Sequence, residues 1–193
     1  MQNTLPLLIL CGGRSSRMGT PKPLLPFAGT SLIAWLAAKA RRPVWLAAGG
    51  NRYPDTAQAR YLPDALPDRQ GPLSAILPAL QQAAKEGLDG VYMMSCDTLI
   101  HPESLCRLLS PDNQPPAFTV LAEPEKIHPL LGYWPAPLAD RLHHYLHGGG
   151  RRVTAWLAEA GAQKIIMPEE WLPLVNFNTP QDFAHAVEYF EKI

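Results

Sequence analysis

The sequence predicts a single α/β domain with a Rossmann-like, mostly parallel sheet and helices on both of its faces. Short apolar runs alternate with helical segments along the chain, and several of these runs are apolar throughout. Continuous apolar runs are typical of strands that are buried on both faces, and strands that alternate with helices need crossover connections. At 193 residues the chain fits one domain. Such a domain buries about 70% of the surface that its unfolded chain exposes.

The first half of the chain contains the clearest strands and helices. Strands are expected at residues 5–11, 44–48 and 91–95, and helices at about 31–40, 71–85 and 101–109. Ser31 is the expected cap of the first helix, and Pro72 stands at a first-turn position of the second. In such sheets ligands bind beyond the carboxyl ends of the strands, which here means after Cys11, after Ala48 and after Ser95.

The second half has a looser pattern. Strands are expected near residues 117–122, 130–134 and 164–167, with a further apolar segment at 174–177. Helices are expected at about 137–146 and 152–160, and a last one follows Thr179. Thr179, Pro180 and Asp182 together form the pattern of a capping box with proline in the first turn.

The composition excludes several classes of partner. Lys and Arg number 17, as do Asp and Glu, so the formal net charge is zero and no nucleic-acid or membrane partner is expected. The cysteines Cys11, Cys96 and Cys106 are odd in number and fit no metal-ligand spacing. They suit a reducing cytosol. No run is long enough to span a membrane and the amino terminus lacks a signal-peptide pattern, so we expect a cytoplasmic protein.

The segment from residue 12 to residue 30 is the first candidate site. It follows the first strand, is rich in Gly and Pro, and contains the cations Arg14, Arg17 and Lys22. Glycines let the backbone approach a ligand, and successive N–H groups can bind an anion, so a triphosphate is the expected ligand. The segment is neither a Walker A motif nor a GxGxxG fingerprint. The alternative is a flexible basic loop, but its place after the first strand favours a phosphate site.

Two aspartates are the second candidate. Asp97 ends a buried strand, where a carboxylate needs a partner, and Mg²⁺ that bridges phosphate oxygens would supply one. The alternative for Asp97 is a helix cap, but it precedes the next helix by several residues. Asp64 lies beside a proline and is equally typical of a turn.

Six ordered motifs resemble the molybdenum cofactor nucleotidyltransferase family. The string LCGGRSSRMGTPKPLLPFAG resembles the family loop LAGGxSxRMGxDKxLLxxxG. The other motifs are Gly71-Pro72-Leu73, Cys96-Asp97-Thr98, His128-Pro129-Leu130, GGRRV (149–153) and NFNTPQDF (176–183). The resemblance covers the whole chain. It is greatest to the guanylyltransferases, which join GMP from GTP to molybdopterin on a nucleotide-diphospho-sugar transferase-like fold.

The resemblance implies a role for each matching residue. Nucleotide binding falls to Leu10, Cys11, Gly12, Gly13, Lys22, Asp64 and Asp97. Asp97 would hold Mg²⁺, and catalysis would depend on Asp97, Lys22 and Arg17. The acceptor would meet His128, Arg151, Arg152 and Asn178. The nucleotide part would span about residues 1–110 and the acceptor part about 111–193.

Three positions depart from the family pattern. Pro21 replaces an Asp, Leu99 replaces a proline, and Gly49 stands where the family has a nucleotide-contacting Asn. These changes put base specificity in doubt but leave Asp97 and Lys22 in place. Cytidylyl relatives usually have Ala at the position of Gly12 and Gly at that of Cys96, so both positions here favour GTP.

The resemblance implies GTP and molybdopterin, or Mo-molybdopterin, as substrates, and leaves contacts with molybdoenzymes or their chaperones open. A phosphate oxygen of the acceptor would attack the α-phosphorus of GTP. No nucleophilic side chain is needed. The alternatives are a cytidylyl- or sugar-phosphate nucleotidyltransferase of the same fold, and a nucleotide-binding relative that has lost activity.

Overall fold

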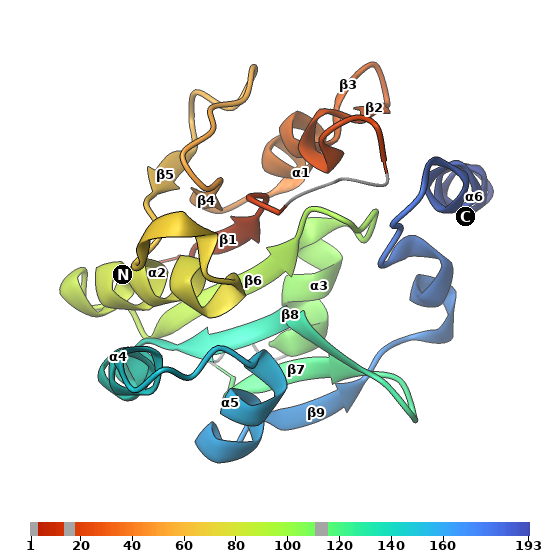
Figure 1. Cartoon of the computed structure of the whole chain (residues 1–193). Coiled ribbons are helices and arrows are strands. Elements are labelled where there is room, and N and C mark those ends of the chain that lie inside the picture. Colours follow the sequence, from red (N-terminus) through yellow and green to blue (C-terminus); the bar gives the residue numbers. More distant parts are fainter. Residues whose placement is uncertain (1–3, 14–17, 111–115) are drawn as a thin grey trace.

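One seven-stranded sheet organises the residues that the structure describes, 4–13, 18–110 and 116–193 of a computed structural model (Figure 1). In spatial order its strands are β5 (Arg60–Leu62), β4 (Val44–Ala47), β1 (Leu7–Leu10), β6 (Gly90–Ser95), β8 (Ile127–Pro135), β7 (Thr119–Ala122) and β9 (Gln163–Ile166). Neighbouring strands are parallel from β5 to β6 and between β7 and β9. β8 runs antiparallel to both β6 and β7. The predicted mostly parallel sheet is therefore confirmed, with one reversed strand in its middle.

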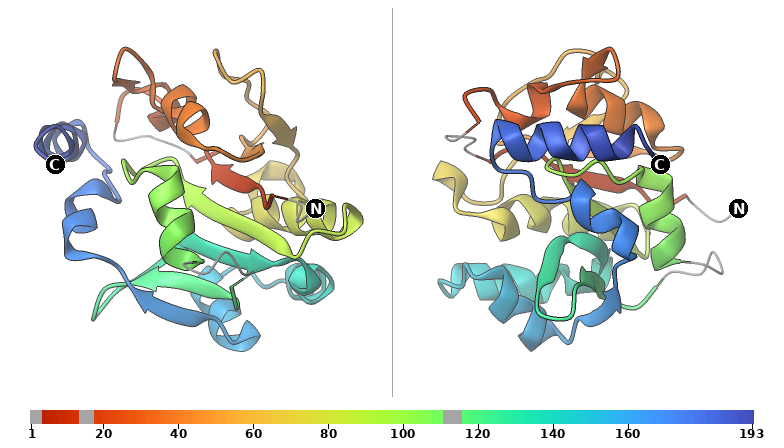
Figure 2. Two further views of the ribbon diagram at one scale, coloured as in Figure 1. Left: turned by 180° about the vertical axis from the view of Figure 1, so that it is seen from behind. Right: turned by 90° about the vertical axis from the view of Figure 1, so that its right-hand side faces the viewer.

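Helices cover both faces of this sheet, as predicted (Figures 1 and 2). The helices α1 (Leu32–Lys39), α3 (Pro102–Leu109) and α6 (Pro180–Phe190) contribute to the core on one face. The helices α2 (Pro72–Lys85), α4 (Ala139–His147) and α5 (Val153–Ala160) contribute to the core on the other. β1 shows the division directly, because Leu7 and Ile9 pack on the first face while Leu8 and Leu10 pack on the second.

The predicted helix starts agree with the local chemistry. Ser31 accepts a hydrogen bond from Ala34 N at the start of α1. At the start of α6 the hydroxyl of Thr179 accepts from Asp182 N, and the Asp182 carboxylate accepts from Thr179 N, so the capping box is confirmed. Among residues 4–13, 18–110 and 116–193, no helix has the length and apolar character to cross a membrane.

Several short elements differ from the sequence prediction. The segment expected to be a loop contains the 3₁₀ helix η1 (Lys22–Leu24) and a hairpin of β2 (Pro26–Phe27) and β3 (Thr30–Ser31). The edge strand β5 was not predicted, because its three residues Arg-Tyr-Leu carry no apolar run. The remaining 3₁₀ helices are η2 (Pro67–Arg69), η3 (Ala136–Leu138) and η4 (Glu169–Leu174).

Candidate active site

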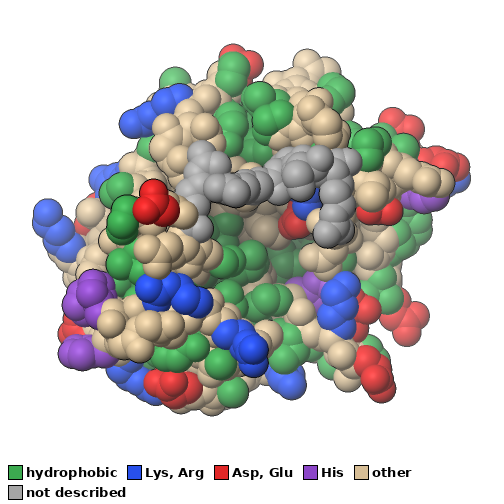
Figure 3. Space-filling model, in the orientation of Figure 1, with side chains coloured by type: hydrophobic (Ala, Val, Ile, Leu, Met, Phe, Trp, Pro, Cys, Tyr) green, Lys and Arg blue, Asp and Glu red, His purple; other side chains and the backbone are tan. Residues whose placement is uncertain are grey.

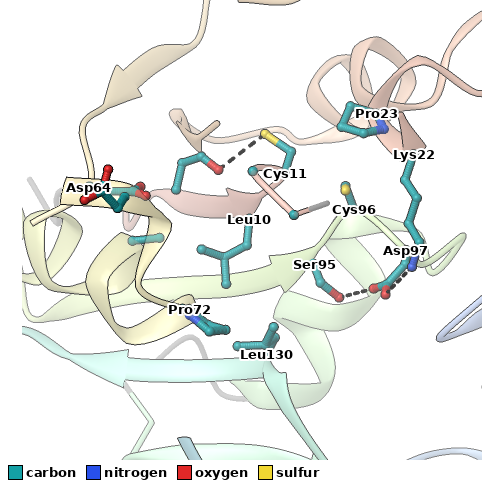
Figure 4. Close-up of a pocket in the computed structure, with 16 residues that line it drawn as sticks. Leu10, Cys11, Lys22, Pro23, Asp64, Pro72, Ser95, Cys96, Asp97 and Leu130 are labelled. Carbon is teal, nitrogen blue, oxygen red and sulfur yellow. Dashed lines mark hydrogen bonds and ion pairs between the residues drawn. The ribbon is translucent and has the colours of Figure 1, made fainter. Parts of the chain in front are cut away.

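A cavity of about 320 Å³ lies at the carboxyl ends of β1, β4 and β6 (Figure 4). This is the edge of the sheet where the strand order predicts a ligand. In Figure 3 the same face is hollowed near its centre, with hydrophobic side chains at the floor of the hollow. Seven lining residues are the seven predicted to bind nucleotide, namely Leu10, Cys11, Gly12, Gly13, Lys22, Asp64 and Asp97. The structure therefore brings the predicted nucleotide-binding set together around one space.

Lys22 and Asp97 meet at one end of this cavity. Lys22 Nζ lies 3.1 Å from Asp97 Oδ2, and the two side chains are 15% and 22% exposed. Ser95 Oγ donates to the other carboxylate oxygen, Oδ1, at 2.5 Å. Lys22 Nζ also donates to Asn178 Oδ1 at 2.9 Å. The sheet edge, η1 and the carboxyl-terminal segment thus converge on one ammonium group.

Asp64 lies at the other end of the cavity. Figure 4 shows it on the far side from Lys22 and Asp97, with Leu10 between. Only Pro63 separates it from the end of β5, so the strand missed in the sequence is what places this carboxylate. The cavity therefore has one end with an ion pair and one end with a separate half-buried carboxylate.

The glycines after β1 allow the backbone to approach the end of β4. A Cβ atom at Gly12 would lie 2.9 Å from Gly49 N and 3.1 Å from the carbonyl carbon of Ala48. Both neighbours are backbone atoms, so a side chain at Gly12 would push the two strand ends apart. At Gly13 a Cβ atom would meet no atom of the described residues within 4 Å.

Tyr53 forms a hydrogen bond with the residue that follows β1. Its hydroxyl donates to the carbonyl of Cys11 at 2.9 Å, and burial raises the pKa of this phenol. Burial also raises the pKa of the Cys11 thiol to about 12 and that of Cys96 well above its usual value. Both thiols remain protonated at neutral pH, so neither is a ready nucleophile.

The four residues predicted to meet the acceptor have different surroundings. Asn178 is exposed and contacts Lys22 directly. His128 is 3% exposed, and its ring nitrogens lie 2.6 Å from Glu123 Oε1 and 3.0 Å from Asn176 Nδ2. Arg151 donates to Gln70 Oε1 and to the carbonyls of Leu146 and Gly150. Arg152 is exposed at the start of α5.

Two cations of the sequence prediction, Arg14 and Arg17, lie outside the described residues. The three departures from the family pattern can be located. Pro21 precedes η1 and its carbonyl accepts from Leu24 N. Gly49 has a positive φ of 57°. Leu99 is fully buried and its N–H donates to Leu174 O, a bond that a proline could not make.

Two polar residues with contacts at the Lys22–Asp97 end of the cavity were not among the predicted site residues. Ser95, the last residue of β6, was recognised only as a strand end, although its hydroxyl donates to Asp97. Asn176 lies within the NFNTPQDF motif but was not singled out. The signal that could have found Asn176 is its spacing, since two asparagines flank a buried Phe177 directly before a helix cap.

The described residues contain no group of three or more His, Cys, Asp or Glu side chains that could hold a metal. Asp97 is the carboxylate at the strand end of the cavity, with Ser95 beside it. A single carboxylate fits the way Mg²⁺ is commonly held, because that ion takes most of its other oxygens from water and phosphate.

Comparison with known proteins agrees with this geometry. The model of the MobA-like NTP transferase domain matches residues 7–162. The chain belongs to the MobA-like NTP transferase family. As a member of that family it is an enzyme, a nucleotidyltransferase.

Relatives from Rhizobium meliloti and Cereibacter sphaeroides are among those named molybdenum cofactor guanylyltransferase. The one from Rhizobium meliloti is 33% identical over 195 residues, covering 94% of this chain and 89% of the relative. The one from Cereibacter sphaeroides is 34% identical and covers 96% of each chain.

Solved structures show the same fold. Molybdopterin-guanine dinucleotide biosynthesis protein A from Archaeoglobus fulgidus has a TM-score of 0.72 at 21% identity, covering 98% of this chain and 100% of its own. A 2-C-methyl-D-erythritol 4-phosphate cytidylyltransferase from Thermus thermophilus has a TM-score of 0.57 at 15% identity, covering 98% of this chain and 100% of its own. At these identities the likeness concerns the fold alone.

Proposed function

We propose that this enzyme transfers GMP from GTP to molybdopterin and releases pyrophosphate. The observation that carries the proposal is the contact between Lys22 and Asp97 at one end of a cavity that the carboxyl ends of three strands form. The guanylyltransferase relatives, which align along almost the whole chain, support the choice of substrates.

The two ends of the cavity suit the two ends of a nucleotide. Lys22 and the backbone of Gly12 and Gly13 offer positive charge and N–H groups for the triphosphate. Asp64, on the opposite side, can accept hydrogen bonds from the nucleoside, and Leu10 lines the space between. Arg17 is proposed as a further phosphate contact from the family loop.

Asp97 is the residue that would hold Mg²⁺, which when bound supplies positive charge that neutralises phosphate oxygens. Lys22 Nζ contacts the Asp97 carboxylate and balances its charge. Asn178 accepts a hydrogen bond from the same ammonium group and keeps it at the site. When a triphosphate is bound, the same ammonium group would stabilise the charge of the departing pyrophosphate.

The protein needs to supply no nucleophile and no general base. A phosphate oxygen of the acceptor is already ionised at pH 7 and would attack the α-phosphorus, breaking its bond to the bridging oxygen of pyrophosphate. The cavity thiols Cys11 and Cys96 stay protonated because burial raises the pKa of each. Catalysis then rests on positioning and charge stabilisation.

The acceptor would bind beside Asn178, in the part of the chain from about residue 111 onwards. Asn178 is exposed and touches Lys22, so a group bound there would lie next to the phosphate end of the cavity. Arg152 is exposed and available for an anionic acceptor, whereas Arg151 is engaged with Gln70. A cytoplasmic location is part of this proposal and suits three unpaired, buried cysteine thiols.

The test is pyrophosphate release from GTP, CTP, ATP and UTP, each with Mg²⁺ and with or without molybdopterin. We expect release only with GTP and molybdopterin together. Preference for CTP, or for a sugar phosphate as acceptor, would favour the other nucleotidyltransferases of this fold. Binding without release would favour an inactive relative. A thermal-shift series measures the binding separately, since a ligand at about 100 times its dissociation constant adds about 2.7 kcal/mol of stability.

A further inference from the structure

We propose that His128 and Glu123 are positioning residues that hold the Asn176–Asn178 segment, and through it Lys22, in place for nucleotide transfer. The inference rests on the proposed function and revises the expected role of His128. In place of a contact with the acceptor, His128 forms the buried centre of a chain of hydrogen bonds that ends at the active site.

His128 is saturated by partners inside the protein. It lies on β8 with 3% of its surface exposed, and its Nε2 lies 2.6 Å from Glu123 Oε1. Its Nδ1 lies 3.0 Å from Asn176 Nδ2. Because an amide nitrogen only donates, Nδ1 is the acceptor and the ring proton sits on Nε2, which donates to the Glu123 carboxylate. No ring nitrogen remains to bind an acceptor.

Asn176 receives this support at a point of backbone strain. Its φ is 58°, in the left-handed region that asparagine tolerates better than most residues. Its N–H donates to the carbonyl of Asp97 at 2.8 Å, and its own carbonyl accepts from Asn178 Nδ2 at 2.8 Å. The hydrogen bond to His128 fixes its side chain. Asn176 is therefore held on three sides in a conformation that turns the chain toward Lys22.

Asn178 connects Asn176 to the active site by hydrogen bonds to Asn176 and to Lys22. Its Oδ1 accepts from Lys22 Nζ at 2.9 Å, and Lys22 in turn contacts Asp97. Its own N–H donates to Asp182 Oδ2 at 3.0 Å, so the cap of α6 fixes it from the other side. The segment passes the carboxyl end of β6 on its way from η4 to α6 (Figures 1 and 2), and Leu99 N donates to Leu174 O beside it.

The sequence of contacts is thus Glu123, His128, Asn176, Asn178, Lys22 and Asp97. A histidine that served packing alone would need no polar partner in the segment that reaches Lys22. Here the buried imidazole contacts Glu123, directly after β7, and Asn176, whose carbonyl accepts from the asparagine that contacts Lys22. Loss of His128 would leave Asn176 without its side-chain partner and would loosen Asn178.

A double-mutant cycle on the full chain tests the inference. His128→Leu removes both hydrogen bonds, Asn178→Ala removes the contact to Lys22, and both changes are then combined. We expect each single change to lower kcat of GMP transfer by about tenfold or more, and the double mutant to be little worse than either, because residues in one network are not additive. Independent, multiplying effects, or an unchanged kcat in a folded His128→Leu, would overturn the inference.

Matched variants separate positioning from folding. Thr119 lies on the neighbouring strand β7, and its buried hydroxyl donates to the carbonyl of Ala117. Thr119→Val removes this polar group and should lower Tm without lowering kcat. If His128→Leu does not fold, His128→Gln and Glu123→Leu replace it in the cycle. Glu123→Gln keeps an acceptor for Nε2 and should retain most of the activity. A Glu123→Leu variant as active as Glu123→Gln would contradict the proposed role.

Failure of the proposed function would show differently. If the wild-type protein releases no pyrophosphate with any triphosphate, the proposed reaction is wrong. The double-mutant cycle is then repeated with the Kd for GTP, measured by calorimetry, in place of kcat. If His128 acts by positioning Asn178, His128→Leu and Asn178→Ala should each weaken GTP binding, and the double mutant should bind GTP about as weakly as either single variant. Additive losses, or no loss from His128→Leu, would overturn it on that readout as well.

Discussion

Lys22 and Asp97, 75 residues apart in the chain, form an ion pair of 3.1 Å at the phosphate end of the cavity. Both side chains are largely but not fully buried, so their attraction is screened less than that of a surface pair. Each group therefore costs free energy if its partner is removed and no ligand takes its place. The pair gives separate predictions for the two residues.

Replacing Asp97 should stop catalysis and leave the fold intact. Asp97→Asn keeps the size of the side chain and an oxygen for the Ser95 hydroxyl, but loses the charge that would hold Mg²⁺. We expect turnover to fall more than about a hundredfold, since a lost metal ligand costs several kcal/mol of transition-state stabilisation. Pyrophosphate release measures it. Asp89→Asn is the control, because exposed Asp89 lies at the opposite end of the same strand and should leave turnover unchanged.

Replacing Lys22 should mainly weaken binding of the triphosphate. A hydrogen bond to a charged group contributes about 1.5–3 kcal/mol, so Lys22→Met should raise the Kd for GTP by about tenfold to more than a hundredfold. Isothermal calorimetry gives this directly. Lys85→Met, at the distant end of α2, is the matched control. Equal affinity of Lys22→Met and Lys85→Met would remove Lys22 from the nucleotide site.

The sequence predicts the central part of the fold because its signals are local. The runs that become β1, β4 and β6 are mainly apolar. The helices that follow them have recognisable start signals, which are the Ser31 cap of α1, Pro72 in α2 and Pro102 in α3. β5 and the β2–β3 hairpin could not be predicted in the same way. Their two or three residues acquire strand structure from pairing with a neighbour, which a pattern along the chain does not contain.

The site is predictable only where the chain supplies consecutive residues. The glycines after β1 and the aspartate after β6 follow from strand ends, and the structure places both beside one cavity. The interaction of Asn178 with Lys22 spans 156 residues, so no local pattern indicates it. His128 shows the limit most clearly. The motif around it is visible in the sequence, but its two hydrogen-bond partners, Glu123 and Asn176, are set by tertiary structure.

Acid should release the cap that fixes Asn178. The pKa of Asp182 is lowered, first by the N–H of Asn178 and then by Thr179. A lowered folded-state pKa adds stability above the unfolded value of about 3.9 and loses it as pH falls through the folded pKa. Asp182→Asn should therefore have a lower Tm than the wild type at pH 6, and the difference should close in strong acid. Thermal unfolding across this range measures it, and a constant difference would contradict the assignment.

Gly12 and Gly13 offer the sharpest comparison, because they are adjacent and differ in their surroundings. A methyl group at Gly12 would meet Gly49 N at 2.9 Å, and this neighbour is backbone that moves only if the ends of β1 and β4 separate. We expect Gly12→Ala to lower stability by about 1–3 kcal/mol, as overpacking does elsewhere. GTP affinity should fall as well, since the displaced strand ends line the cavity.

Gly13→Ala adds the same methyl group at a position where no atom of the residues that the structure describes lies within 4 Å, so its unfolding free energy should stay near that of the wild type. Denaturant unfolding of the two variants isolates the steric effect from the shared change in composition. Equal stability of the two would mean that the β1–β4 contact yields easily. In that case the reason for a glycine at position 12 would be the close approach of a ligand to the backbone. GTP affinity measured on the same two variants would then distinguish steric contact with β4 from ligand approach.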